Sequence, residues 1–198
     1  MALKLEECRR VFLDSTVISD LLNFPNINKY DAAAQNRLRT VKSLIDTLSA
    51  NKSTGGERIF SISTVSISEV FATNEGDFKA IYEAIQLMIG SNNLEVISYN
   101  RRISILHNEV FGEVMSKAEI NKLKVETGYK DSVYVNVRER IRKDYFIIAT
   151  ALSQKSDIVF TADDGFEKLC KKMGLNCVLT AKENFIWNQG DDKIYGLQ

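Results

Sequence analysis

Histidine is nearly missing from this sequence: His107 is the only one among 198 residues. One histidine excludes chemistry that needs a histidine pair, and it disfavours a Ser-His or Cys-His nucleophile pair. The three cysteines, Cys8, Cys170 and Cys177, form no Cys-x-x-Cys motif. Zinc sites built from histidine or clustered cysteine are therefore excluded too. The chemistry must rest on carboxylates, hydroxyl groups, lysine and arginine.

The sequence is also poor in proline, has no long apolar run and has no excess of one charge. Pro25 is the one proline, and without a Ser/Gly-rich tract we expect no flexible linker. The sequence contains no run of about 18 apolar residues, so it predicts no membrane span. Its first ten residues lack the apolar core of a secretory signal. The three scattered cysteines are expected to be reduced thiols. The sequence therefore predicts a cytoplasmic protein. Its 26 basic and 26 acidic residues cancel, so the net charge gives no argument for nucleic-acid binding.

Short apolar segments alternate with helical patterns along the chain. The expected strands are Arg10–Leu13, Arg58–Ser63, Leu94–Ser98, Asp157–Thr161 and Asn176–Thr180. The expected helices cover 15–23, 31–51, 65 onward, 77–90, 100–123, 144–153 and 164–173, before a polar tail from 181 to 198. This alternation predicts an α/β fold in three layers, with a central, mainly parallel sheet flanked by helices. Ligands of such folds bind outside the carboxyl ends of the strands.

Acidic residues recur where strands end and helices begin: Asp14, Glu69, Asp144, Asp163 and Asp164. Each has a purely structural explanation. Asp14 and the Asp163–Asp164 pair would cap the helices that follow them. Glu69 stands three residues after Ser66, which fits a capping box, and Asp144 is expected in the first turn of its helix, where it would complement the helix dipole.

Together, these acids suggest a metal site. In a parallel sheet all of them would lie at one edge, where carboxylates raise one another's pKa unless they share a cation. Oxygen ligands without histidine or cysteine suit Mg²⁺ or Mn²⁺. Such an ion can hold a phosphodiester and activate water without a histidine base.

Four segments carry a resemblance to a known family: VFLDSTVISDLL, TVSISEVF, KDYFIIATAL and IVFTADDGF. In this order they resemble the four acidic motifs of PIN domains, metal-dependent ribonucleases that include the VapC-type toxins. The resemblance covers about a quarter of the chain. It implies a parallel sheet between helices, Mg²⁺ or Mn²⁺ as cofactor, single-stranded RNA or tRNA as substrate, and an antitoxin protein and a second copy of the chain as partners.

The resemblance also assigns residues. The four acids that ligate metal and catalyse hydrolysis fall on Asp14, Glu69, Asp144 and Asp163. Glu69 is either a ligand or the organiser of metal-bound water. Three residues fall on supporting positions: Ser15, Thr161 and Asp164. Asp164 is adjacent to Asp163 and is an alternative for the fourth acid.

The spacing departs from a compact PIN toxin, because 75 positions separate Glu69 from Asp144. We expect one PIN-like domain over residues 1–198 with a helical insertion within about 77–142, serving as a lid, a dimerisation surface or an RNA platform. Arg138, Arg142 and Lys143 precede or adjoin Asp144 and are candidates for RNA phosphate contacts. A solvated helix face is the alternative.

Aromatic and histidine side chains in the same region have two interpretations. Tyr129, Tyr134 and Tyr145 could stack on RNA bases, although packing is the more common use. His107 shares a helical face with apolar residues and is expected to be packed, not catalytic.

Three other classes of function are weighed against the nuclease. A PIN-like module that binds RNA or protein without turnover would keep the fold but not need four acids. A haloacid-dehalogenase-like phosphohydrolase also places an Asp after its first strand, but it requires a second Asp two residues later, where this chain has Thr16. A receiver-type phosphoacceptor domain would need an acid pair at the first strand, which is missing.

Overall fold

The computed structural model describes residues 5–74, 78–89, 93–112, 116–131, 136–181, 186–188 and 193–195. Its central sheet consists of β1 (Arg10–Leu13), β2 (Ile59–Ser63), β3 (Leu94–Ile97), β4 (Ile158–Thr161) and β5 (Cys177–Leu179). The strands lie in the order β3-β2-β1-β4-β5 and every pairing is parallel. All five therefore end at the same edge, as the sequence predicts.

Eight helices flank this sheet in the described part of the chain. They are α1 (Ser15–Asn23), α2 (Ala32–Ala50), α3 (Thr64–Asn74), α4 (Phe78–Ile89), α5 (Arg101–Gly112), α6 (Lys117–Thr127), α7 (Val137–Ser153) and α8 (Asp164–Lys172). Short 3₁₀ helices cover Leu5–Glu7 and Phe24–Lys29, and strands β6 (Ile186–Asn188) and β7 (Lys193–Tyr195) form a separate antiparallel pair. None of the described helices is both long enough and apolar enough to cross a membrane.

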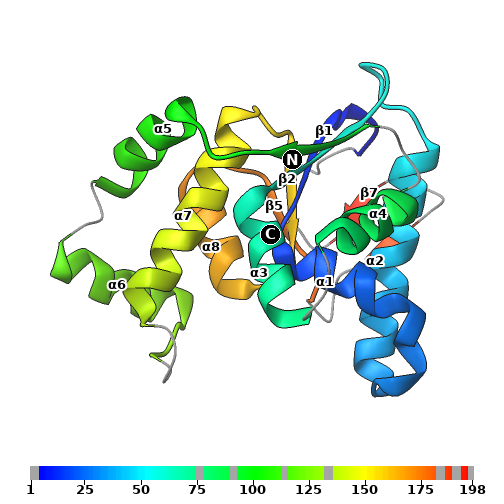
Figure 1. Ribbon diagram of the computed structural model, residues 1–198, viewed down its shortest axis with the longest axis horizontal. Coiled ribbons are helices and arrows are strands. Elements are labelled where there is room, and N and C mark those ends of the chain that lie inside the picture. Colours follow the sequence, from blue (N-terminus) through cyan, green and yellow to red (C-terminus); the bar gives the residue numbers. More distant parts are fainter. Residues whose placement is uncertain are drawn as a thin grey trace.

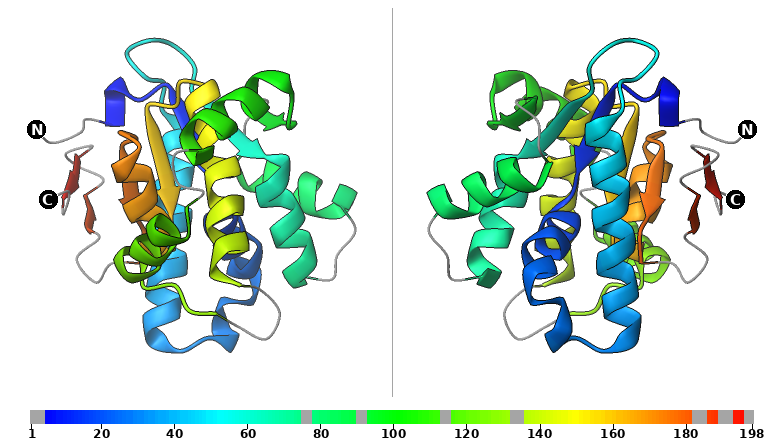
Figure 2. Two further views of the ribbon diagram at one scale, coloured as in Figure 1. Left: turned by 90° about the vertical axis from the view of Figure 1, so that its left-hand side faces the viewer. Right: turned by 90° about the vertical axis from the view of Figure 1, so that its right-hand side faces the viewer.

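Alternation along the strands builds a hydrophobic core on each face of the sheet. Val11 and Leu13 of β1 pack in one core with α1, α2, α3 and α4, whereas Phe12 packs in the other with α5, α6, α7 and α8. This is the two-residue period of a strand. In Figure 1 the α5–α8 side lies to the left of the sheet and α1, α2 and α4 lie to the right. Figure 2 shows the same layers from the two sides.

Two helix predictions were wrong. The segment from 100 to 123 contains two helices, because α5 ends at Gly112 and α6 begins after Ser116, whose side chain caps it. Helix α7 begins at Val137 with Asn136 as its cap, so Asp144 lies two turns inside the helix and not in its first turn.

The capping box at Ser66 was also wrong. Ser63 supplies the cap, since its Oγ accepts from the amide of Ser66 at 2.9 Å. Glu69 is therefore further along α3 than the sequence suggested, which removes the capping explanation for its carboxylate.

The segment 77–142 holds α4, β3, α5, α6 and the start of α7. Because β3 pairs with β2, part of this segment belongs to the central sheet. Its description as an insertion within one domain stays a prediction. Asp77, Val114 and Tyr134 lie outside the described residues. Cys8, Cys170 and Cys177 are buried free thiols, in agreement with the sequence.

Candidate metal and RNA site

The site lies at the carboxyl ends of the two central strands. Strands β1 and β4 are adjacent and in register from Val11 to Leu13, so Asp14, directly after β1, meets Thr161, the last residue of β4. The amide of Asp14 donates to the carbonyl of Phe160 at 3.1 Å. This adjacency brings the first and fourth sequence motifs together, although 147 positions separate Asp14 from Thr161.

Asp14 is a buried carboxylate surrounded by hydroxyl donors. Its Oδ2 accepts from Thr16 Oγ1 and Thr161 Oγ1, both at 2.9 Å, while its exposed fraction is 3%. The Ser15 hydroxyl lies 3.4 Å from Oδ1. Burial raises the pKa of Asp14 and these hydrogen bonds oppose the rise. Asp14 also caps α1, so its structural and proposed functional roles coexist.

Thr16 and Thr161 tie the two strand ends to each other. Thr16 Oγ1 accepts from the amide of Ala162 at 2.8 Å, and Thr161 Oγ1 accepts from the amide of Asp163 at 3.0 Å. The two hydroxyls therefore fix the turn that carries Asp163 relative to Asp14. Thr16 had no role in the sequence prediction.

Glu69 and Asp144 approach from the two helices on either side of this edge. Burial raises the pKa of Glu69; a hydrogen bond with Ser15 lowers it, the charge of Asp14 raises it, and Lys143 and Arg140 lower it. The pKa of Asp144 is raised well above its usual range by burial, and further by Asp14, Asp163 and Glu69. The charges of Asp14, Asp163 and Glu69 therefore act on Asp144, and that of Asp14 acts on Glu69.

Asp163 and Asp164 have different surroundings. Asp163 caps α8 by accepting from the amide of Phe166 at 3.0 Å, and it faces Tyr129 and Arg140. Asp164 pairs with Lys168 on the surface of α8, with 56% of its side chain exposed. Of the two, only Asp163 is directed at the acid cluster, which favours it as the fourth acid.

Tyr129 and Arg140 hold two of these acids. The Tyr129 hydroxyl donates to Asp144 Oδ2 at 2.7 Å and lies 3.4 Å from Asp163 Oδ1. Burial and the charges of Asp144 and Asp163 raise the pKa of Tyr129, so the phenol keeps its proton. Arg140 donates to Asp163 Oδ2 at 2.6 Å, with its guanidinium carbon 3.9 Å from the centre of the Tyr129 ring.

Gly165 makes room for this arrangement. A Cβ on Gly165 would lie 2.1 Å from Tyr129 Cε1 and 2.6 Å from Cζ, so no larger residue fits beneath the ring. The sequence analysis considered Tyr129 only for packing or base stacking and did not consider Gly165. A glycine directly after two helix-opening aspartates was the one available signal.

The donor set fits a hard divalent cation, because four carboxylates and several hydroxyls gather where burial leaves carboxylate charge poorly compensated. The spacing of the acids is less favourable for metal binding in this conformation. Across the described residues, no three Asp, Glu, His or Cys side chains are arranged to hold one ion. In the same conformation, Tyr129 donates a hydrogen bond to an oxygen of Asp144, and Arg140 donates one to an oxygen of Asp163.

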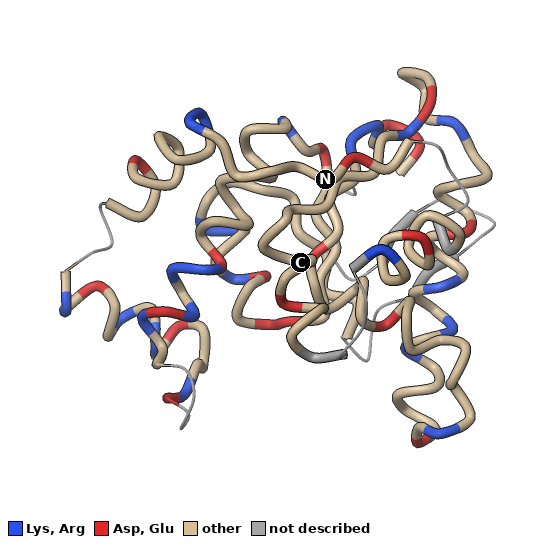
Figure 3. Tube along the Cα trace, in the orientation of Figure 1, with Lys and Arg blue, Asp and Glu red and all other residues tan. Residues whose placement is uncertain are grey.

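The candidate RNA-binding residues lie along α7 beside these acids. Arg138, Arg142 and Lys143 are exposed. Lys143 is near enough to Glu69 to lower its pKa, whereas Arg142 lies over the Phe146 ring at 5.5 Å and 3.9 Å from Glu139. Figure 3 shows basic and acidic residues interleaved along α6 and α7, not a purely basic stripe.

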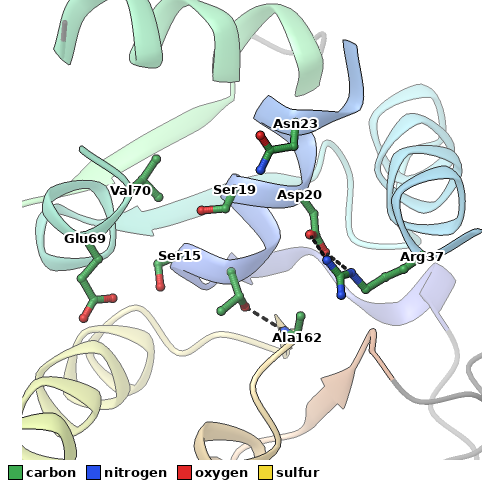
Figure 4. Close-up of a pocket in the computed structure, with 9 residues that line it drawn as sticks. Ser15, Ser19, Asp20, Asn23, Arg37, Glu69, Val70 and Ala162 are labelled. Atoms are coloured by element: carbon green, nitrogen blue, oxygen red, sulfur yellow. Dashed lines mark hydrogen bonds and ion pairs between the residues drawn. The ribbon is translucent and has the colours of Figure 1, made fainter. Parts of the chain in front are cut away.

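A pocket of about 420 Å³ opens next to Glu69. It is lined by Ser15, Thr16, Ser19, Asp20, Asn23, Arg37, Glu69, Val70 and Ala162. Figure 4 shows it along α1, with Glu69 and Val70 on one side and the Asp20–Arg37 ion pair on the other. Arg37 bonds Asp20 through Nε at 3.1 Å and Nη2 at 2.9 Å. This pocket, whose lining residues are mostly of polar types, was not predicted from the sequence.

His107 is packed, as predicted. It is 4% exposed and stacks on Phe146 with ring centres 3.7 Å apart. Burial lowers its pKa, which favours the neutral form.

No protein-family model matches the sequence, and no curated protein sequence matches it. Among solved structures, the fold is similar to one from the Rickettsia felis VapBC2 complex bound to a DNA fragment from their promoter. The identity is 13%, the TM-score is 0.43, and the match covers 85% of this chain and 97% of that chain. It is also similar to Mycobacterium tuberculosis VapC20, a Sarcin-Ricin loop cleaving toxin. There the identity is 14%, the TM-score is 0.42, and the coverage is 78% of this chain and 92% of that chain. Both of these solved structures contain VapBC-type proteins.

Proposed function

We propose that this protein is a Mg²⁺- or Mn²⁺-dependent endoribonuclease of the VapC-like PIN type. The observation that carries the proposal is the gathering of Asp14, Glu69, Asp144 and Asp163 at one end of the sheet. Burial raises the pKa of Asp14, Glu69 and Asp144, and the charges of neighbouring acids add to the rise for Glu69 and Asp144. Carboxylates in this state are stabilised by a cation.

The four acids would hold the ion, with Thr16 and Thr161 orienting Asp14. When bound, Mg²⁺ or Mn²⁺ supplies a low-pKa water and charge neutralisation at the leaving oxygen. Glu69 also lines the pocket, and it would orient water or serve as a ligand itself. Ser15 bonds Glu69 and lies 3.4 Å from Asp14, which links these two acids.

The substrate is RNA, single-stranded or tRNA, whose scissile phosphate lies over the acids. Arg138, Arg142 and Lys143 would contact neighbouring phosphates from α7. The pocket beside Glu69 would accept the nucleotide next to the cleaved bond, because its hydroxyls and the Asn23 carboxamide offer both donors and acceptors. By its resemblance to VapC-type toxins, the protein would act with an antitoxin partner and as a homodimer.

RNA cleavage tests the proposal. A panel of single-stranded RNAs and tRNA is incubated with wild type, Asp14→Asn and Asp144→Asn, in Mg²⁺, Mn²⁺ or EDTA, with folding checked by circular dichroism. We expect cleavage by wild type in metal only, and none by either folded variant. Cleavage that persists in both variants would refute the proposal.

A catalytically silent PIN-like binding module is the second candidate. The ion pair between Arg140 and Asp163 favours it, because a guanidinium already neutralises one of the acids. The same samples distinguish the two candidates. A silent module would bind RNA without cutting it, and Mn²⁺ would not raise its melting temperature.

A further inference from the structure

The guanidinium of Arg140 is a positive charge beside the acid cluster, where the proposed metal would bind. Its Nη2 lies 2.6 Å from Asp163 Oδ2, and its side chain is 46% exposed against 20% for Asp163. The guanidinium therefore lies at the mouth of the site, where a ligand from solvent can reach it.

The surface beneath Arg140 is fixed. Tyr129 is 5% exposed, its hydroxyl is held by Asp144, and its ring lies where any side chain at residue 165 would be. The guanidinium stacks on this ring at 3.9 Å. A stacked guanidinium can turn in its own plane towards a new acceptor while it keeps the cation–π contact.

A cation at Asp163 and the guanidinium at Asp163 oppose each other. They compete for the same carboxylate oxygens, and two positive charges a few ångströms apart repel in a poorly solvated site. Cation binding is therefore weakened as long as Arg140 stays on Asp163.

A phosphodiester offers Arg140 another partner. Guanidinium pairs with phosphate oxygens through two parallel hydrogen bonds, as strongly as with a carboxylate. An RNA phosphate over the acid cluster would lie on the exposed side of Arg140, away from buried Tyr129.

We infer that Arg140 exchanges Asp163 for an RNA phosphate, and that this exchange couples RNA binding to metal binding. The inference rests on the proposed function and adds a regulatory role for one residue of that site. Without RNA, Arg140 neutralises Asp163 and keeps metal affinity low; with RNA, Asp163 becomes available to the metal. Because coupling between two ligands is reciprocal, metal must also strengthen RNA binding.

The test measures Mn²⁺ affinity by titration calorimetry on the full chain, with and without a mixed-sequence single-stranded DNA dodecamer as the phosphate ligand. A gel confirms that the dodecamer stays intact. For wild type we expect the dodecamer to tighten Mn²⁺ binding by at least about fivefold. For Arg140→Gln we expect tighter Mn²⁺ binding than wild type without the dodecamer, and no further tightening with it.

Two variants serve as comparisons. Arg39→Gln removes an exposed arginine of α2 whose guanidinium donates to Gln35 Oε1 on the same helix, and it should behave as wild type. Arg140→Lys keeps the charge but loses the two-pronged geometry, so its coupling should be smaller than that of wild type.

The outcomes separate the two proposals. Equal coupling in wild type and Arg140→Gln, or no coupling in a wild type that binds Mn²⁺, would overturn the role of Arg140 alone. No Mn²⁺ binding by wild type in either condition would overturn the proposed nuclease function and this inference with it.

Discussion

Asp144 combines deep burial with three acidic neighbours. Its exposed fraction is 8%, and Asp14, Asp163 and Glu69 all raise its pKa in addition to burial. A carboxyl group whose pKa is raised by folding binds its proton more tightly in the native state. The free energy of unfolding therefore falls as the pH rises from the ordinary carboxyl pKa through the raised one.

We predict that Asp144→Asn stabilises the metal-free protein at pH 7 by about 0.5–2 kcal/mol, because it removes a buried charge that three neighbouring acids repel. Asparagine still accepts the Tyr129 hydrogen bond. The advantage should shrink as the pH falls towards the ordinary carboxyl range, where Asp144 of wild type is protonated. Urea unfolding in EDTA at several pH values measures it. A variant less stable than wild type at pH 7 would show that Asp144 is held by favourable contacts instead.

Gly165 is the second residue whose role can be tested alone. Gly165→Ala places a methyl group 2.1 Å from the Tyr129 ring, and we expect a loss of about 1–3 kcal/mol of stability as the ring is displaced. Gly112→Ala is the matched control, since nothing lies within 4 Å of its added Cβ. Combining Gly165→Ala with Tyr129→Ala should recover part of the loss. Equal stability of the two single variants would exclude the close contact.

At the level of single elements, α7 contributes three residues to the candidate site and its surroundings. It presents Asp144 to the cluster, Arg140 to Asp163 and Lys143 towards Glu69. Its start was not predicted correctly, because polar residues between 138 and 143 hide the apolar positions Val137 and Ile141. These two are nevertheless buried four residues apart, so the helical period was present in the sequence.

The start of α7 gives a direct prediction. Asn136 Oδ1 accepts from the amide of Glu139 at 2.9 Å, so Asn136→Ala should cost about 1 kcal/mol of stability. Asn136→Asp keeps the cap and should be nearly neutral. Thermal or urea unfolding compares the two. A neutral Asn136→Ala would mean that the first turns of α7 do not need this cap.

The pocket between α1, α2 and α3 is the element-scale feature that the proposed function assigns to the substrate. Ser19→Gln would fill part of it without touching any of the four acids. We expect KM for RNA to rise on the order of tenfold with kcat little changed, since only binding is lost. Ser68→Gln, on the exposed face of α3, is the control and should leave both constants unchanged. An unchanged KM for Ser19→Gln would place the RNA elsewhere.

For the whole molecule, the sequence was sufficient to predict the layers and the edge of the sheet that carries the site. Strand and helix patterns are local, and parallel strands must end together, so Asp14 and Asp163 could be placed at one edge before the fold was seen. The choice between Asp163 and Asp164 could not be made in this way. It depends on Tyr129 and Arg140, which reach Asp163 from 34 and 23 positions away in the sequence.

The charge balance of the whole chain determines which groups could attract RNA to the site. With 26 basic and 26 acidic residues, attraction to RNA must come from a few local groups near the acids. Basic side chains beside the acid cluster serve two purposes in this account: they neutralise acids in the free protein and phosphates in the complex. Arg140, which pairs with Asp163, is the clearest example.

A crystal structure with Mn²⁺ and a bound oligonucleotide, with anomalous scattering to locate the ion, decides whether the four acids form one metal site. The account predicts an anomalous peak at the carboxyl end of β1 and β4, with oxygens of Asp14 and Asp144 and at least one of Glu69 and Asp163 at about 2.0–2.3 Å. Arg140 should then lie on a phosphate. A site without a peak at saturating Mn²⁺, with Arg140 still on Asp163, would contradict the claim that these four acids form one metal site.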